Sequence, residues 1–378
     1  MRGMLAGLSA LLLAIGFAAP AAAKDDTPDP EWVGVWQGSI GRLPIVACFD
    51  RWNSGEGRGS YYYSVHLKPI RLKGDETGRN WAEGNNTGEP GTEVVPSLTF
   101  TDITEERIEG RWRAGKRSLG IVLHRIPDGA EDYYDACASA NFLAPRVVKP
   151  EFERAGATVG GFDFTRLRYK VPAHFEDVEI GGFTFAPTQP GDGRIIEWLG
   201  SKLPQGKVDD EFLQCLAGAL TVHGVDGYYA MGLSPVFAND ELLSIDQNSS
   251  DYCGGAHPNH WKQYFTFDRK TGAQLEPVDW FNSKGTGVSE YGSTLMQPDL
   301  RALIVSHWPE YENEPDECSG YAEDQEWWGY QIRREGIQFQ PDLPHVITPC
   351  EEEILIGWDE LEPFLSDAGK DLRERAQR

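Results

Sequence analysis

The chain has 378 residues, of which 40% are hydrophobic and 25% are charged, and its formal net charge at pH 7 is −24. So acidic a surface argues against nucleic-acid binding, because proteins hold phosphate backbones mainly by neutralising them with Lys and Arg. The length suggests two domains of about 150 residues each, and the abundant aromatic side chains supply apolar area for their cores.

The first 23 residues have the pattern of a secretory signal peptide. Arg2 is followed by an apolar stretch from about Leu5 to Ala18, then by Pro20 and three alanines. A basic start, a short apolar core and a small-residue end are typical of a cleaved signal. The apolar stretch is shorter than the roughly 20 residues of a membrane helix. We expect a periplasmic or secreted bacterial protein with no membrane span after cleavage; an uncleaved anchor is the alternative.

Short strands separated by turn residues predict a β domain over residues 31–145. Residues 61–68 alternate between two faces, as a half-buried strand does. Residues 107–113 alternate in the same way, and residues 118–126 are their expected hairpin partner. The run 83–91 is rich in Gly and Asn, which predicts a loop. An antiparallel β sandwich or a small barrel fits this region.

Residues 145–165 are expected to form a linker, followed by a second domain over residues 165–370. The repeated GGFDF at 160–164 and GGFTF at 181–185 are interpreted as two hairpin turns, because Gly-Gly favours turns.

Helical periodicity appears in the second domain. Helices are expected around Ile195–Leu199, from Asp209 or Asp210 to Gly224, from Leu300 to Trp308, and briefly around Leu361–Leu365. Strands are expected between and after them, at 229–232, 242–246, 261–267, 337–339 and 353–356. The whole chain is therefore predicted to be α+β, with an antiparallel sheet packed with helices in its C-terminal domain.

Six cysteines follow the expected signal: Cys48, Cys137, Cys215, Cys253, Cys318 and Cys350. An even number in an exported chain predicts disulfides. The spacing does not fix the connectivity, and the favoured pairing is Cys48–Cys137, Cys215–Cys253 and Cys318–Cys350. None of the cysteines belongs to a C-x-x-C pair, which argues against a redox or zinc site.

The stretch DYCGGAHPNH at residues 251–260 gathers the side chains best suited to chemistry. His257 and His260 are three positions apart, but Pro258 between them excludes a shared helix face. No second His or Cys cluster offers the third ligand that a zinc site needs. We therefore expect neither a metal nor a cofactor.

Catalysis has no specific motif. Cys253 and His257 could form a thiolate–imidazole pair, but the even cysteine count argues against a free thiol. There is no G-x-S-x-G elbow, and the acidic runs 310–317 and 351–353 single out no carboxylate pair for glycoside hydrolysis. We expect no enzyme; the alternative is a cell-wall hydrolase or deacetylase that uses His257 with nearby carboxylates.

A presented turn explains the same residues. Gly254 and Gly255 permit positive φ, Pro258 fixes the backbone, and Asn259 suits a turn. Loops held at the surface are common recognition sites. The expected binding residues are Tyr252, Gly254, Gly255, His257, Asn259 and His260.

The run CGGAHPNHWKQYFTFDRKTGAQL at 253–275 resembles the signature of a bacterial extracytoplasmic domain. That domain occurs in the lysozyme-sensing anti-sigma factor and in some peptidoglycan deacetylases. The matching residues are Tyr252, Gly254, Gly255, Ala256, His257, Pro258, Phe267, Asp268, Thr271, Gly272 and Phe281. Residues 336–365 are similar to the closing pattern of the family, so the resemblance covers about residues 165–370.

The resemblance implies a binding function. The sigma-binding segment and the deacetylase domain of the relatives have no counterpart here, so those activities are not carried over. What it implies is recognition of a basic protein such as lysozyme, or of peptidoglycan, and an acidic chain is compatible with a cationic partner. The hypothesis is a non-enzymatic exported binding protein of the cell envelope; a purely structural envelope protein is a further alternative.

Overall fold

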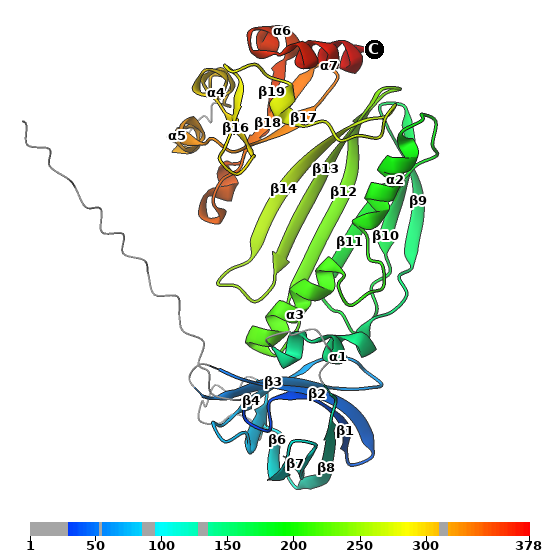
Figure 1. Ribbon diagram of the computed structural model, residues 1–378, viewed down its shortest axis with the longest axis vertical. Coiled ribbons are helices and arrows are strands. Elements are labelled where there is room, and N and C mark those ends of the chain that lie inside the picture. The colour runs from blue at the N-terminus through cyan, green and yellow to red at the C-terminus, as the bar shows by residue number, and fades with distance from the viewer. Residues whose placement is uncertain (1–28, 53–54, 85–94, 128–134, 310–316) are drawn as a thin grey trace, which may run out of the picture. The chain divides into compact units, whose positions relative to one another are not determined.

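The computed structural model describes residues 29–52, 55–84, 95–127, 135–309 and 317–378. The expected signal peptide lies outside these ranges, as do most of the expected loop at 83–91 and of the acidic run at 310–317. Glu31–Arg378 forms one compact unit of α+β class, as expected (Figure 1). Among the residues described, no helix is both long and apolar enough to cross a membrane.

The first eight strands close into an antiparallel barrel, which is one of the two architectures expected here. They are β1 (Gly34–Ile40), β2 (Leu43–Arg51), β3 (Gly57–Tyr63), β4 (Ile70–Gly74), β5 (Asn80–Glu83), β6 (Ser97–Ile103), β7 (Arg107–Ala114) and β8 (Arg117–Arg125). β1 pairs with both β2 and β8, which closes the barrel. Its interior is filled by a core that includes Trp36, Phe49, Trp81 and Phe100.

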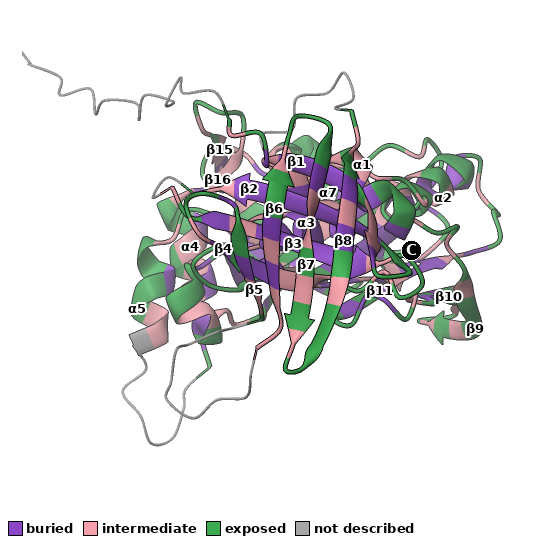
Figure 2. Cartoon of the chain, turned by 90° about the horizontal axis from the view of Figure 1, so that it is seen from below, coloured by how far each residue is buried: buried purple, intermediate pink, exposed green. Residues whose placement is uncertain are grey.

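Strands β2 and β3 are buried on both faces, unlike the half-buried strand expected at 61–68. Figure 2 shows the contrast with β7, whose residues are mostly intermediate or exposed. Tyr61 belongs to the barrel core. Tyr62 is also buried, and its hydroxyl donates to the Phe142 carbonyl at 2.7 Å. The strand ends at Tyr63, so the second half of the expected strand is a turn.

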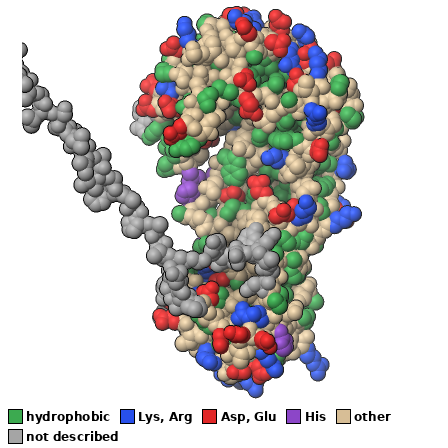
Figure 3. Space-filling view, in the orientation of Figure 1, with side chains coloured by type: hydrophobic (Ala, Val, Ile, Leu, Met, Phe, Trp, Pro, Cys, Tyr) green, Lys and Arg blue, Asp and Glu red, His purple; other side chains and the backbone are tan. Residues whose placement is uncertain are grey.

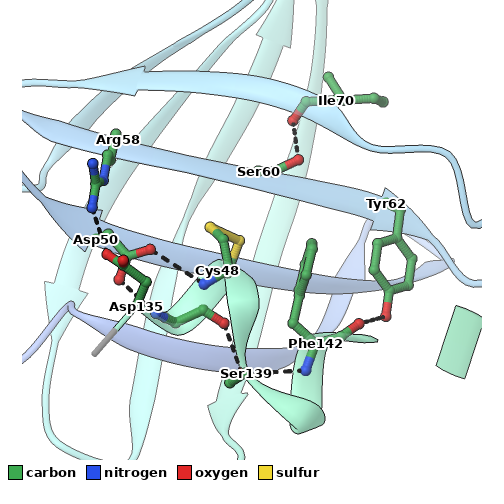
Figure 4. Close-up of a disulfide and its surroundings, with 11 residues drawn as sticks. Cys48, Asp50, Arg58, Ser60, Tyr62, Ile70, Asp135, Ser139 and Phe142 are labelled. Atoms are coloured by element: carbon green, nitrogen blue, oxygen red, sulfur yellow. Dashed lines mark hydrogen bonds and ion pairs between the residues drawn. A yellow bond between two sulfur atoms is a disulfide. The ribbon is translucent and has the colours of Figure 1, made fainter. Parts of the chain in front are cut away.

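Three short helical turns follow the barrel: η1 (Ala136–Ala138), α1 (Ala140–Leu143) and η2 (Ala144–Arg146). The Cys48–Cys137 disulfide joins η1 to β2 (Figure 4). Beside it, the Asp50 carboxylate accepts the backbone N–H groups of Ala136 at 2.7 Å and Cys137 at 3.2 Å. Asp50 is only 3% exposed, and burial raises its pKa to about 6.

The second region is built on a six-stranded sheet with the order β14-β13-β12-β11-β10-β9. Its strands are β9 (Phe152–Val159), β10 (Phe162–Tyr169), β11 (Val178–Thr184), β12 (Tyr228–Ala238), β13 (Leu242–Tyr252) and β14 (Asn259–Asp268). Every pair is antiparallel except β11 with β12. The sheet is therefore mixed, because the connection from β11 to β12 carries two helices and returns the chain in the same direction.

These two helices cover one face of the sheet (Figure 1). They are α2 (Asp192–Ser201) and α3 (Glu211–His223), close to the expected positions. α3 ends at Gly224, whose φ of 69° is the left-handed conformation that glycine favours. Asp210 occupies the N-cap position, but its carboxylate accepts N–H groups of the preceding loop instead of the helix.

Two expectations for the start of this region are wrong. The expected linker at 145–165 contains β9 and the first part of β10. Gly160 and Gly161 do form the hairpin turn between them, with φ of 54° and 87°. Gly181 and Gly182, however, lie inside β11 and make no turn. The effect of the pair there is that two consecutive positions of β11 carry no side chain.

The C-terminal part has its own core around Trp280, Ile304, Tyr330, Phe339 and Trp358. Its elements are η3 (Pro277–Asp279), β15 (Thr286–Val288), β16 (Thr294–Met296), α4 (Pro298–Val305), α5 (Glu317–Asp324), β17 (Trp328–Ile332), β18 (Gly336–Pro341), η4 (His345–Cys350), β19 (Ile354–Gly357), α6 (Trp358–Leu361), η5 (Glu362–Phe364) and α7 (Asp367–Gln377). β17, β18 and β19 form a three-stranded sheet, and β17 contacts β13 and β14.

A fully buried arginine joins several of these elements. Arg146 in η2 donates from Nη1 and Nη2 to the two Asp226 oxygens at 2.9 and 2.5 Å. Its Nε donates to the Leu67 carbonyl at 3.1 Å, and its guanidinium lies 4.9 Å from the centre of the Phe175 ring. The pair therefore connects a turn of the barrel with the loop before β12.

Replacing Arg146 with Met is expected to lower the free energy of unfolding by about 3–5 kcal/mol, because the Asp226 side chain, only 15% exposed, then loses its cation. The double variant Arg146→Met/Asp226→Leu should recover part of this loss, since it removes the stranded charge. Urea denaturation of the three proteins measures both effects. A loss below about 1 kcal/mol in the single variant would contradict the role of this pair.

The raised pKa of Asp50 predicts a pH dependence. A carboxyl whose folded pKa lies above its unfolded value stabilises the fold at low pH, and that contribution is lost as pH rises through about 6. Between pH 4 and pH 7, wild type should therefore lose roughly 2 kcal/mol of stability relative to Asp50→Asn. Urea denaturation of both proteins across this range tests it. A relative stability of wild type that rises with pH would show that burial does not dominate at Asp50.

Candidate functional site

A pocket of about 460 Å³ lies on the sheet and is lined by residues of four neighbouring strands. We call it the sheet pocket. Its lining residues are Glu179 and Gly181 of β11, Ala230, Met231 and Gly232 of β12, Asn248, Ser249 and Ser250 of β13, His260, Trp261 and Lys262 of β14, and Glu351.

Strand register explains how the floor of the sheet pocket is built. One cross-strand row consists of Glu179, Ala230, Ser250 and His260, and the next of Gly181, Gly232, Asn248 and Lys262. Directly paired residues place their side chains on the same face of a sheet. Met231 alternates with these rows and belongs to the core beneath α2 and α3. The sheet pocket is therefore on the face away from the helices.

The middle of the floor is bare because it lacks side chains. A Cβ atom placed on Gly232 would meet nothing within 4 Å, and one on Gly181 only the Leu167 carbonyl oxygen at 3.7 Å. Neither glycine has a positive φ, so the backbone does not require glycine at either position. The missing side chains leave space above the strands, at positions where side chains would otherwise cover the backbone.

The wall contributed by Glu351 is held by polar contacts to β18 and the segment after it, and Glu353 ties the same segment to β14. The Glu351 carboxylate accepts the Leu343 N–H and the Gln340 side-chain amide, both at 3.1 Å. Burial raises the pKa of Glu351, and the nearby Asp342 carboxylate raises it further. Lys262 forms an ion pair with Glu353 at 2.7 Å. The closing segment around η4 is therefore fixed next to the last strand of the sheet.

The hairpin tip between β13 and β14 is fixed by a disulfide. Cys253 is bonded to Cys215 of α3, and all six cysteines are paired as the sequence analysis favours. The tip approaches α3 so closely that a Cβ on Gly254 would lie 2.7 Å from the Gly218 carbonyl oxygen. Gly254 also has a φ of 91°, so both sterics and backbone conformation require glycine there.

Of the expected binding residues, Tyr252 and Asn259 make local structural contacts. The Tyr252 hydroxyl is hydrogen-bonded to His223 Nε2 at 2.7 Å, and their rings stack. The Asn259 amide donates to Asp251 at 3.0 Å across the hairpin. Gly255 is exposed on the loop. A binding role for these residues stays a prediction.

The two expected histidines are exposed and share a third histidine that sequence spacing does not reveal. The His257 and His345 rings are nearly parallel, with centroids 4.6 Å apart. His260 lies beside the same His345 ring, at 5.6 Å. His345 begins η4, far along the chain. Figure 3 shows histidine side chains at the margin of a hollow in the surface.

The geometry bears on the chemistry that the motif could perform. Within the described residues, the His257 ring contacts the Pro258 carbonyl and the His345 ring, and neither contact involves a carboxylate. Cys215, Asp251 and Cys253 bring their ligand atoms within 4.8 Å of one another. The two sulfurs are bonded to each other in the disulfide, so this group offers neither a thiolate nucleophile nor a metal site.

No family model matches the chain, and no curated protein matches its sequence. Two solved structures of DUF3298 family proteins show a weak likeness. The one from Bacteroides fragilis NCTC 9343 is 13% identical with a TM-score of 0.33, and the match covers 58% of this chain and 93% of that chain. The one from Pseudomonas aeruginosa PAO1 is 15% identical with a TM-score of 0.30, covering 58% and 96%.

Removing the Cys215–Cys253 disulfide is expected to destabilise the protein and loosen the hairpin tip. The bridge spans 38 residues, and closing a loop of that size in the unfolded chain contributes about 4 kcal/mol of stability. The variant Cys215→Ser/Cys253→Ser should lose stability of this order in urea denaturation and show faster amide exchange at 253–260. Alkylation of the unreduced wild-type protein should label no cysteine. Labelling at Cys253 would refute the fixed tip.

Proposed function

We propose that the chain is an exported, non-enzymatic binding protein of the cell envelope that recognises a strongly basic, cell-wall-active protein such as a lysozyme. The recognition surface is the sheet pocket together with the hairpin tip at 252–260. The observation that carries the proposal is the bare floor of the sheet pocket at Gly181 and Gly232, next to a tip that a disulfide fixes. A preformed hollow next to a rigid loop costs little ordering on binding.

Charge favours a cationic partner. Glu351 takes its hydrogen bonds from neutral donors, the Gln340 amide and the Leu343 N–H. Lys262, which itself lines the sheet pocket, is already paired with Glu353. A lysine or arginine side chain entering the sheet pocket would therefore find the Glu351 carboxylate, which forms no ion pair with the residues that the structure describes. The overall charge of −24 would also speed the encounter with a basic protein.

The resemblance of residues 252–281 to the lysozyme-sensing domain supports the same class of partner. In this chain the Gly-Gly-Ala-His-Pro stretch forms the hairpin tip, beside β14 and the sheet pocket. The enzyme alternative lacks comparable support, because His257 has no carboxylate contact among the residues described.

Titration of the mature protein against a panel of lysozymes, at low ionic strength and then with rising salt, tests the proposal. Binding that weakens with salt is expected for an acidic surface that meets a basic one. The absence of binding to any member at low salt would reject lysozyme as the partner. Retention on insoluble peptidoglycan alone would identify the wall as the ligand instead.

The substitution Gly232→Val locates the site, because it adds a side chain to the floor of the sheet pocket at a position where a Cβ meets nothing within 4 Å. We expect binding to fall at least tenfold while the melting temperature stays close to that of wild type. Gly120→Val is the matched control, since Gly120 also lies in a strand, would have nothing within 4 Å of an added Cβ, and belongs to the barrel. Equal losses in the two variants, or no loss at Gly232, would place recognition elsewhere.

A further inference from the structure

Three of the protein's 8 histidines meet at one place, and two distant segments supply them. His257 lies on the hairpin tip, His260 at the start of β14, and His345 at the start of η4. The planes of the His257 and His345 rings differ by 2°, and those of His260 and His345 by 14°. All three side chains are exposed, so the burial of apolar surface does not explain why they gather.

The nitrogen atoms of these rings remain available. His257 Nδ1 lies 2.9 Å from the Pro258 carbonyl oxygen. A carbonyl oxygen can only accept, so Nδ1 is the donor in this contact, and in the neutral ring Nε2 is the nitrogen that offers a lone pair. His260 and His345 make no side-chain hydrogen bond with the residues that the structure describes. A backbone carbonyl that fixes one ring nitrogen while the other stays free is a common arrangement around metal-ligating histidines.

We propose that His257, His260 and His345 form a binding site for a divalent transition-metal ion such as Zn²⁺. Neutral imidazole is a preferred ligand of zinc, copper and nickel, whereas calcium and magnesium prefer oxygen. Three imidazoles with a water as fourth ligand complete a tetrahedral zinc site. The fold thus supplies the third ligand whose absence from the sequence pattern argued against a metal.

Metal binding requires the three exposed side chains to turn. The ring nitrogens do not all lie within 4.8 Å of one another, whereas two imidazole nitrogens on one tetrahedral zinc lie about 3.3 Å apart, given Zn–N distances of about 2.0–2.1 Å. The His257 and His345 rings are nearly parallel with centroids 4.6 Å apart, so their side chains have to rotate before the in-plane lone pairs converge on one ion. The backbone is already held on both sides, because Cys253 and Cys350 anchor the two segments through separate disulfides. The acidic surface also raises the local cation concentration.

Calorimetric titration of Zn²⁺ into the metal-free mature protein, without any partner, tests this site independently of the proposed function. Wild type is expected to bind one equivalent. His257→Ala and His345→Ala should each weaken Zn²⁺ binding at least tenfold. The double variant His257→Ala/His345→Ala should abolish Zn²⁺ binding, and His260→Ala should weaken binding less than this double variant does. His124→Ala is the matched control, because His124 is also exposed but belongs to β8 of the barrel.

Two further measurements distinguish a histidine site from general attraction to an acidic surface. Ca²⁺ and Mg²⁺ should bind at least tenfold more weakly than Zn²⁺, and Zn²⁺ should raise the melting temperature of wild type but not of the double variant. Circular dichroism before titration confirms that each variant is folded. Zn²⁺ binding that is unchanged in the double variant, equally lost in His124→Ala, or matched by Ca²⁺ would overturn the proposal.

Discussion

The bond between Cys215 and Cys253 is the constraint on which the candidate site depends. Helix α3 contacts β12 and β13 of the six-stranded sheet, β3 of the barrel, and η1. The disulfide attaches the hairpin tip to this helix. The tip is so close to α3 that Gly254 and Gly218 leave no room for side chains between them. A loop of exposed polar residues would otherwise sample many conformations at considerable entropic cost. Here its position is set before any ligand arrives.

Local pattern is enough to predict the elements whose signals are local. The alternation at 107–113 and the glycine at the end of α3 both correspond to observed features. The burial of Tyr62 does not follow from alternation, because its outer face is covered by α1, which is remote in sequence. Helix α7 escapes prediction because its sequence is mostly charged and buries only Gly369, Leu372 and Ala376. The parallel pairing of β11 with β12 is a property of the connection, which strand propensity does not contain.

The candidate site divides in the same way. Turn chemistry predicts a fixed tip at 252–260, and the cysteine count predicts its anchor. The bare floor is not predictable, because Gly181 and Gly232 become neighbours only through the register of β11 and β12. His345 also escapes prediction, since nothing in its own surroundings suggests that η4 returns to His257. The one available signal for this contact is that histidines occur in both stretches of the chain that resemble the family, residues 253–275 and 336–365. Contacts between remote segments decide the chemistry here, and a single sequence does not encode them in any periodic form.

The two disulfides near the sheet pocket determine in which redox environment the segments around the pocket are held in place. Cys253 and Cys350 each hold one of the segments that border it. In a reducing compartment both bridges would be open, and the strands could pair while the tip and the closing segment stayed loose. Maturation of the surface would then be an oxidation event, completed only in an oxidising environment.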